Sequence, residues 1–127
     1  MLKSLRRKHI WIQTRFGFFS IVEKADDKQR GTLTIRARVK SDLEALRDKY
    51  LPDIDILEGG GTDYAYRATA PKDMVSAALG QIVGDIRYPN FKQAVAESQG
   101  YDRADAYNDV WTVLYGLQDR GRGNHGW

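Results

Sequence analysis

The sequence predicts an α+β fold, with an antiparallel sheet of about five strands, helices on one face and two further helices at the C-terminal end. Residues 32–40 alternate apolar and polar side chains, which is the period of a strand with one buried face. Residues 41–50 then repeat apolar side chains at helical spacing, and a glycine-tipped hairpin and a second amphipathic helix follow. This order of strand, helix, hairpin and helix is typical of a split βαβ, or ferredoxin-like, half.

Two strands are expected before this segment. Residues 10–16 alternate, with isoleucine and phenylalanine on one side and Trp11, Gln13 and Arg15 on the other. Residues 18–23 form a second strand, or continue the first one past Gly17, whose tolerance of positive φ suits a turn or bulge. Residues 25–31 are predicted to be a polar loop that ends at Gly31 and closes a hairpin.

The central strand divides its residues between two faces. The alternation predicts a core-facing set of Leu33, Ile35, Ala37 and Val39. It predicts an outward set of Thr34, Arg36, Arg38 and Lys40. Ser41 and Glu44 have the spacing of a capping box, so we expect the helix over residues 41–50 to begin there, with Asp42 facing water and Pro52 beyond its end.

The second half of the chain is predicted to be mainly helical. A short strand at 54–57, a tip at Gly59–Gly61 and a strand at 63–69 are followed by a helix over residues 71–86, in which Gly80 and Gly84 are expected to pack closely on the sheet. Asn90 suits the cap of a helix over residues 91–99. The last helix is expected to start with Asp102 as its cap. Its predicted buried stripe consists of Tyr107, Val110, Trp111, Leu114 and Leu117.

Length and composition favour one domain over residues 10–118, between a basic arm at 1–9 and a flexible tail at 119–127. The chain has no cysteine, no apolar run long enough to span a membrane and no signal-peptide pattern, so we expect a cytoplasmic protein. The pI near 9.2 arises largely from the arm, because the body between residues 10 and 118 is slightly acidic.

Most catalytic chemistries are poorly supported. His9 and His125 fall in the two predicted ends, and without cysteine a Ser/Cys–His site or a zinc site is not expected. The glycines at 59–61 precede a strand and have no neighbouring lysine, which favours a hairpin tip over a phosphate-binding loop. Asp102, Asp105 and Asp109 could hold Mg²⁺, but acids at a helix start more simply favour the helix dipole. We therefore predict no catalytic residue, metal or cofactor.

The best candidate surface is the outward face of the sheet. It would carry Arg36, Arg38 and Lys40, joined by Gln13, Arg15 and Arg67, with Trp11 and Phe18 as exposed aromatics. Such a face could bind nucleic acid or an acidic protein. The alternatives are a solvated face with salt bridges, a dimer interface, or a face that the C-terminal helices cover. Tyr64 and Tyr66 are expected to point to the core.

Three segments carry a resemblance: Trp11–Val22, Gly61–Arg67 and Trp111–Gln118. Together they resemble a family of small uncharacterised bacterial and phage proteins, over about residues 11 to 118. The resemblance implies no activity and transfers no functional residue. It does make Gly61–Arg67 the place to look for a shared site, with Asp63 and Arg67 as the outward polar pair.

The function class that follows is a small non-enzymatic binding or regulatory module, consistent with a phage-type accessory or inhibitor protein. It would engage nucleic acid or a protein partner through the basic sheet face and the arm. One alternative is an enzyme acting on a phosphate ester or nucleotide, with Arg36, Arg38, Arg67 and Asp63 in its site. The other is a structural homodimer formed through the open sheet face.

Overall fold

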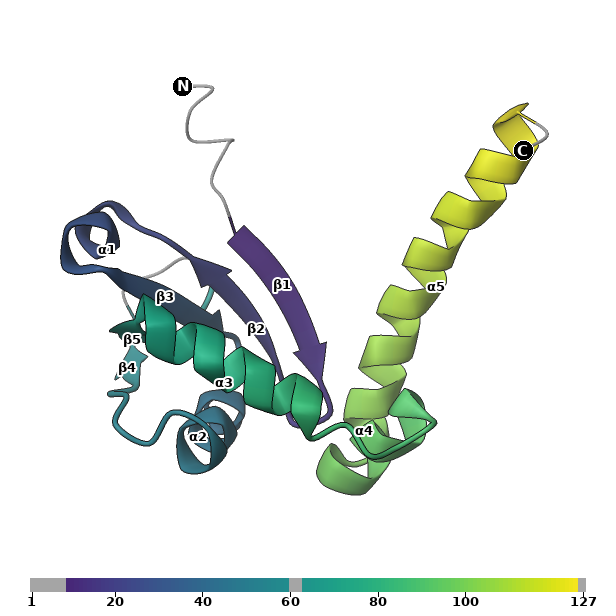
Figure 1. The fold of residues 1–127 in the computed structure, drawn as a ribbon. Helices are drawn as coiled ribbons and strands as arrows, with labels where there is room; N and C mark the ends of the chain where they lie inside the picture. The colour runs from purple at the N-terminus through teal and green to yellow at the C-terminus, as the bar shows by residue number, and fades with distance from the viewer. Residues whose placement is uncertain (1–8, 60–62, 126–127) are drawn as a thin grey trace. The chain divides into compact units, whose positions relative to one another are not determined.

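The structure is a computed structural model that describes residues 9–59 and 63–125, with side chains through residue 118 (Figure 1). The chain divides into two compact units, Met1–Arg87 and Tyr88–Trp127, rather than the single unit predicted for residues 10–118. Of the predicted basic arm, only His9 lies within the described residues. Each unit is considered by itself below.

The first unit is an α+β sheet domain, as predicted. Its described elements are β1 (His9–Thr14), β2 (Gly17–Val22), α1 (Ala25–Arg30), β3 (Thr32–Ala37), α2 (Lys40–Lys49), β4 (Leu57–Glu58), β5 (Tyr66–Pro71) and α3 (Lys72–Gly84). The strands form one sheet in the order β1-β2-β3-β5-β4, and every neighbouring pair is antiparallel. A tight turn at residues 15–16 joins β1 to β2, so the second strand does not continue the first.

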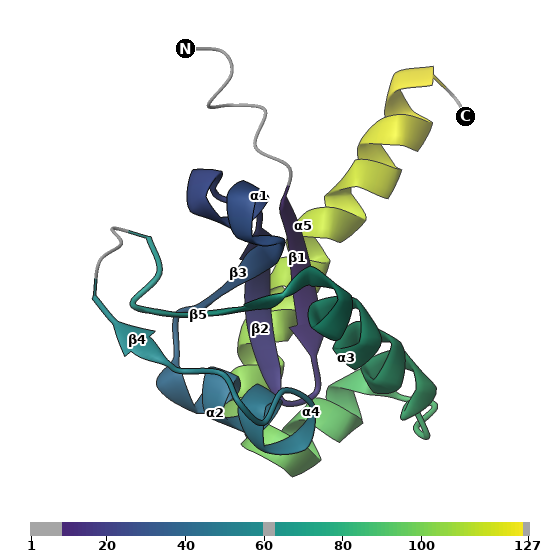
Figure 2. The same cartoon turned by 60° about the vertical axis from the view of Figure 1, so that its left-hand side comes forward.

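Helices α2 and α3 cover one face of this sheet (Figures 1 and 2). Ile35 and Ala37 of β3 are buried on that face, as the alternation predicts, against Leu43 of α2 and Val75 of α3. Aromatic and aliphatic side chains of β2 and alanines of β5 complete the core. Burial of this apolar surface is the main force that holds the two layers together.

The segment predicted to be a polar loop is instead the short helix α1. Asp27, at the third helical position, accepts a 2.9 Å hydrogen bond from the backbone amide of Lys24 and so satisfies the helix start. Gly31 ends the helix in the left-handed region, with φ of 69°. The helix was missed because its six residues are too few and too polar to show an apolar period.

The start of α2 also differs from the prediction. The helix begins at Lys40 with Val39 as its N-cap, so Ser41 is not the cap and the predicted capping box is wrong. Asp42, expected in water, is buried and accepts a 2.9 Å hydrogen bond from the amide of Phe18. Gly17 has no positive φ; a Cβ there would lie 2.7 Å from the Cβ of Asp42, so glycine allows this close approach.

Three further predictions about unit one need correction. The hairpin strands are displaced, since β4 covers only Leu57–Glu58 and β5 extends through Pro71. Val39 is 41% exposed because it lies beyond β3. A Cβ at Gly80 or Gly84 would meet nothing within 4 Å, so these glycines do not mediate close packing on the sheet.

The second unit contains α4 (Phe91–Gln99) and α5 (Tyr101–His125). Asn90 caps α4 as predicted, with its side chain accepting a 3.0 Å hydrogen bond from the amide of Gln93. The rings of Phe91 and Tyr107 stack between the two helices, with centroids 5.9 Å apart. Tyr101 is the first residue of α5, so Asp102 lies inside its first turn. The helix continues through His125, so it contains most of the positions assigned to the tail at 119–127.

The buried stripe predicted for α5 is wrong beyond its first turns. Ala104 and Tyr107 are buried, whereas Val110, Trp111, Leu114 and Leu117 are between 41% and 60% exposed. The physical reason is the difference in length. Helix α4 has nine residues whereas α5 has 25, and the ring stacking of Phe91 on Tyr107 lies in the early part of α5. None of the helices within residues 9–59 and 63–125 has the length and apolar character needed to cross a membrane.

Candidate binding site on the sheet

A continuous row of four residues crosses the sheet on the face opposite α2 and α3. The strand register pairs Trp11 with Ser20, Ser20 with Arg36, and Arg36 with Arg67. Directly paired residues of antiparallel strands project from the same face, at about 5 Å from one strand to the next. The row therefore joins β1, β2, β3 and β5, with an aromatic ring at one end and two guanidinium groups at the other.

Trp11 and Phe18 form the aromatic end of the row. Their rings meet edge to face, with centroids 5.7 Å apart, and Trp11 is 64% exposed whereas Phe18 is partly buried. Packing against Phe18 restricts the indole while leaving much of it accessible. The prediction that these two aromatics lie on the outward face is confirmed by the register.

Arg36 is held at the centre of the row. Its Nη2 donates a 2.8 Å hydrogen bond to Ser20 Oγ, and its guanidinium lies 4.6 Å from the ring centre of Tyr64. The guanidinium of Arg38, just beyond β3, lies 4.3 Å from the same ring. Tyr64 was predicted to point to the core. It is buried, at 8% exposed, but lies outside the main apolar cluster and supports two arginines through cation–π contacts. Tyr66, by contrast, packs against the core as expected.

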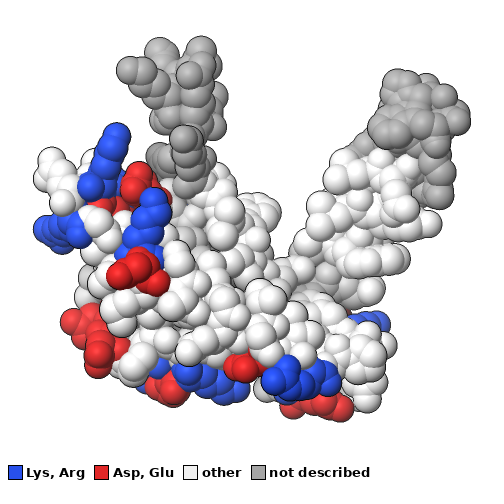
Figure 3. Space-filling model, viewed as in Figure 1, with Lys and Arg blue, Asp and Glu red and all other residues white. Residues whose placement is uncertain are grey.

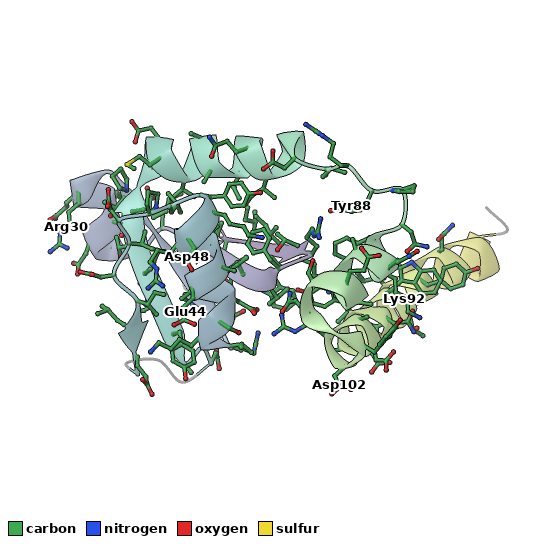
Figure 4. The ribbon with its side chains drawn as sticks, turned by 90° about the horizontal axis from the view of Figure 1, so that it is seen from below. Arg30, Glu44, Asp48, Tyr88, Lys92 and Asp102 are labelled. Atoms are coloured by element: carbon green, nitrogen blue, oxygen red, sulfur yellow. The ribbon has the colours of Figure 1, made fainter. Side chains whose placement is uncertain are left out.

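A pocket of about 450 Å³ adjoins the row at Arg67, between α1 and the start of the β4–β5 hairpin. Arg67 Nη2 donates a 3.2 Å hydrogen bond to the carbonyl of Gly59 at this edge. The basic residues of the lining are Lys24, Arg30 and Arg67, and its acidic residues are Asp26, Asp27 and Glu58. Figure 4 shows Arg30 at the outer end of α1, and Figure 3 shows charges of both signs gathered around that helix.

Asp27 fixes the α1 side of the pocket. It is 3% exposed, and its carboxylate accepts hydrogen bonds of 2.6 Å from Thr32 Oγ1 and 2.7 Å from Thr34 Oγ1. Burial acts to raise the pKa of Asp27, but the hydrogen bonds and the charge of Lys24 outweigh it, so the pKa lies below its ordinary value. The prediction of a polar loop placed Asp27 in solvent. The structure instead makes Asp27 a buried anion that holds α1 against β3.

The remaining predicted site residues are not all brought together. Arg15 is exposed in the β1–β2 turn, and Lys40 is exposed as the first residue of α2, so neither lies on the strand row. Asp63 is exposed before β5 and does not line the pocket. Thr34 is buried by its bond to Asp27. Only Trp11, Arg36, Arg38 and Arg67 of the predicted set contribute to the row or its support.

Sequence reasoning missed the pocket itself, because it depends on α1. The one local signal was an acid placed three residues after Lys24 and followed by Gly31, which is the spacing of a short capped helix. Elsewhere, Asp102, Asp105 and Asp109 are exposed on α5. No group of three or more His, Asp or Glu side chains in the described parts of the chain is arranged to hold a metal ion.

Comparisons with known proteins return no relative. No protein-family model, no curated protein and no solved structure matches the chain. The resemblance drawn from the sequence segments therefore stays a prediction.

Proposed function

We propose that the first unit binds single-stranded nucleic acid across the sheet face opposite α2 and α3. The observation that carries the proposal is the row Trp11–Ser20–Arg36–Arg67, which combines an accessible indole with two arginines on adjacent strands. Sheet faces that bind single strands stack unpaired bases on aromatic rings and place cations along the phosphates.

The contacts of the arginines leave them able to bind a second partner. A guanidinium has five N–H donors, and the described hydrogen bonds use one from Arg36 and one from Arg67. The Nε of Arg36 is buried, so only its terminal nitrogens can reach a ligand. Arg38 is exposed and adds a third positive charge beside Tyr64. Planar guanidinium groups held on a ring are suited to phosphate oxygens and to stacking on bases.

The alternative of a phosphate-ester enzyme receives less support. The pocket contains Arg67, but Asp63 is not among its lining residues. Asp27, the carboxylate that does line it, has a lowered pKa and accepts bonds from two hydroxyls and an amide. A weakly basic carboxylate with its oxygens so occupied is a poor proton acceptor. We therefore propose a binding role rather than catalysis. The location that we propose, from the sequence, is the cytoplasm.

The test is fluorescence anisotropy of labelled single-stranded RNA, single-stranded DNA and duplex DNA with the full chain and a chain lacking residues 1–8. We expect single strands to bind best and to retain binding after the deletion. Trp11→Ala should weaken binding by roughly 1–3 kcal/mol, the usual range for loss of one stacked base. Lys72→Gln, on α3, is the control for a surface substitution elsewhere on the unit.

Two results would overturn the proposal. One is absence of binding to any nucleic acid at low salt. The other is binding that disappears with residues 1–8 but is unchanged in Trp11→Ala and Arg67→Gln. That second result would place the contact in the arm and leave the sheet face without a role.

A further inference from the structure

The pocket beside Arg67 lies between the sheet and helix α1. Its floor is the outward side of the sheet, where Thr34 pairs with Thr69 and Leu57 pairs with Arg67. Its wall is α1, which contributes Asp26, Asp27 and Arg30. A volume of about 450 Å³ is within the range of small-molecule sites. The pocket therefore has room for one planar ligand at the end of the row.

Two opposite charges of α1 line this pocket without pairing. Asp26 and Arg30 are four residues apart, so they share one side of the helix with Cβ atoms about 5–6 Å apart. Both side chains are exposed, and within the described residues neither has a hydrogen bond or an ion pair. The wall therefore offers a carboxylate and a guanidinium, side by side, to a ligand.

The third charge on this wall, Asp27, is not available in the same way. Its two carboxylate oxygens accept bonds from the hydroxyls of Thr32 and Thr34 and from the amide of Lys24. These bonds hold α1 on β3 and so fix the backbone that carries Asp26 and Arg30 beside the sheet. Asp27 thus positions the wall, while its two neighbours on the helix remain able to bind.

We propose that this pocket selects guanine from a single strand bound along the row, with Asp26 and Arg30 in contact with the base. The inference rests on the proposed function and adds a base preference to it. Guanine has two adjacent donors, N1–H and the N2 amino group, beside two acceptors, O6 and N7. A carboxylate can accept from both donors, and a guanidinium can donate to both acceptors. Adenine, cytosine and uracil each have a single donor group, so they would leave one carboxylate oxygen unpaired.

The charge of the lining favours a base over a phosphate group. The three basic and three acidic residues of the pocket give it no net charge. A phosphate inside it would lie near three carboxylates, and like charges repel. A neutral base adds no charge. Arg67 belongs both to the row and to the lining, so it can hold the phosphate of the nucleotide whose base enters the pocket.

Fluorescence anisotropy of labelled short RNAs with the full chain tests the selection. One RNA contains only uridine, and the others carry guanosine, inosine or 7-deazaguanosine in place of one central uridine. The guanosine RNA should bind about fivefold more tightly than the all-uridine RNA, or better, because a bidentate base contact discriminates by at least this factor.

Each side chain can be tested against the base atom that it is proposed to bind. Inosine lacks the N2 amino group, so Asp26→Asn should remove most of the difference between guanosine and inosine. 7-Deazaguanosine lacks N7, so Arg30→Gln should remove most of the difference between guanosine and 7-deazaguanosine. Asp73→Asn is the matched control, because Asp73 is an exposed acid in the first turn of α3, as Asp26 is in α1.

The all-uridine RNA separates the possible failures. If it binds as tightly as the guanosine RNA, guanine selection is overturned and the proposed function stands. If no RNA binds, both are overturned. A guanosine preference that survives both Asp26→Asn and Arg30→Gln would place the selection outside this pocket. Loss of all-uridine binding in either variant would assign that residue to the backbone or the fold, and would likewise overturn its contact with the base.

Discussion

The carboxylate of Asp42, in the first turn of α2, accepts a 2.9 Å hydrogen bond from the backbone amide of Phe18 in β2. These residues are 24 positions apart, and Asp42 is 2% exposed. The carboxylate thus fixes the helix start against the strand that carries one of the candidate stacking aromatics. Its negative charge also lies at the N-terminus of α2, where the helix dipole favours it.

Replacing Asp42 with alanine should destabilise the first unit by about 1–3 kcal/mol, because the Phe18 amide would lose its acceptor in a partly buried position. Urea unfolding followed by circular dichroism measures the change. Asp48→Ala is the control: Asp48 is on the same helix (Figure 4), its side chain is 64% exposed, and it pairs with Arg47. We expect that variant to lose less than about 1 kcal/mol. Equal losses would contradict a special role for Asp42.

Stability should depend on pH through Asp27. Its pKa in the folded chain is below the ordinary value, so its contribution is present at neutral pH and is lost as the pH falls through the folded pKa. The free energy of unfolding should therefore decrease below about pH 4.

Asp27→Asn separates this effect from that of other carboxylates. The variant should be less stable than the natural chain at pH 7, and the difference should shrink toward pH 2 as Asp27 becomes protonated. Urea titrations of both chains at several pH values give the difference directly. A difference that stays constant with pH would rule out a lowered pKa for this group.

Two glycine-to-alanine substitutions should have opposite effects. Gly31→Ala places a Cβ at φ of 69°, which costs about 1–2 kcal/mol even though nothing lies within 4 Å. Gly80→Ala lies inside α3 in equally open space and should stabilise by up to about 1 kcal/mol. Thermal unfolding measures both. Stabilisation by Gly31→Ala would show that residue 31 does not need the left-handed conformation.

The proposed nucleic-acid contact predicts a specific salt dependence. If Arg67 neutralises one phosphate, Arg67→Gln should reduce the slope of log binding constant against log salt by about 0.7 for a single strand. Arg38→Gln should have a similar effect, and Lys72→Gln should have none. Unchanged slopes in both arginine variants would show that these residues do not contact phosphate.

Much of the fold could be predicted from the sequence because its main signals are local. The alternation of Leu33, Ile35 and Ala37 identifies both the strand and its buried face, and Asn90 identifies a helix start. Buried polar residues could not be predicted in this way. Asp42 resembles an ordinary exposed helix residue until Phe18 is brought beside it by the fold. The pattern also predicted burial of Trp111, because periodicity indicates an apolar side but not what covers it.

The candidate site was predictable only in part, for a related reason. Because side chains alternate between the two faces of a strand, the sequence puts Trp11, Arg36 and Arg67 on outward faces. Only the strand register aligns them in one row. Arg15 and Lys40 have the same outward position in the alternating pattern. They still lie outside the row, because β1 ends at Thr14 and β3 ends at Ala37. The pocket required α1, which apolar periodicity could not reveal.

The bonds of Asp27 have a consequence for the order of folding. Its three hydrogen-bond donors, on Lys24, Thr32 and Thr34, lie three, five and seven residues away in the chain. Closing such short loops costs little entropy compared with the distant pairing of β3 with β5. The α1–β3 corner should therefore form early and serve as a template for the sheet. Pulse-labelling hydrogen exchange should then protect the Lys24 amide before the amides of β5, and the reverse order would exclude such a polar folding nucleus.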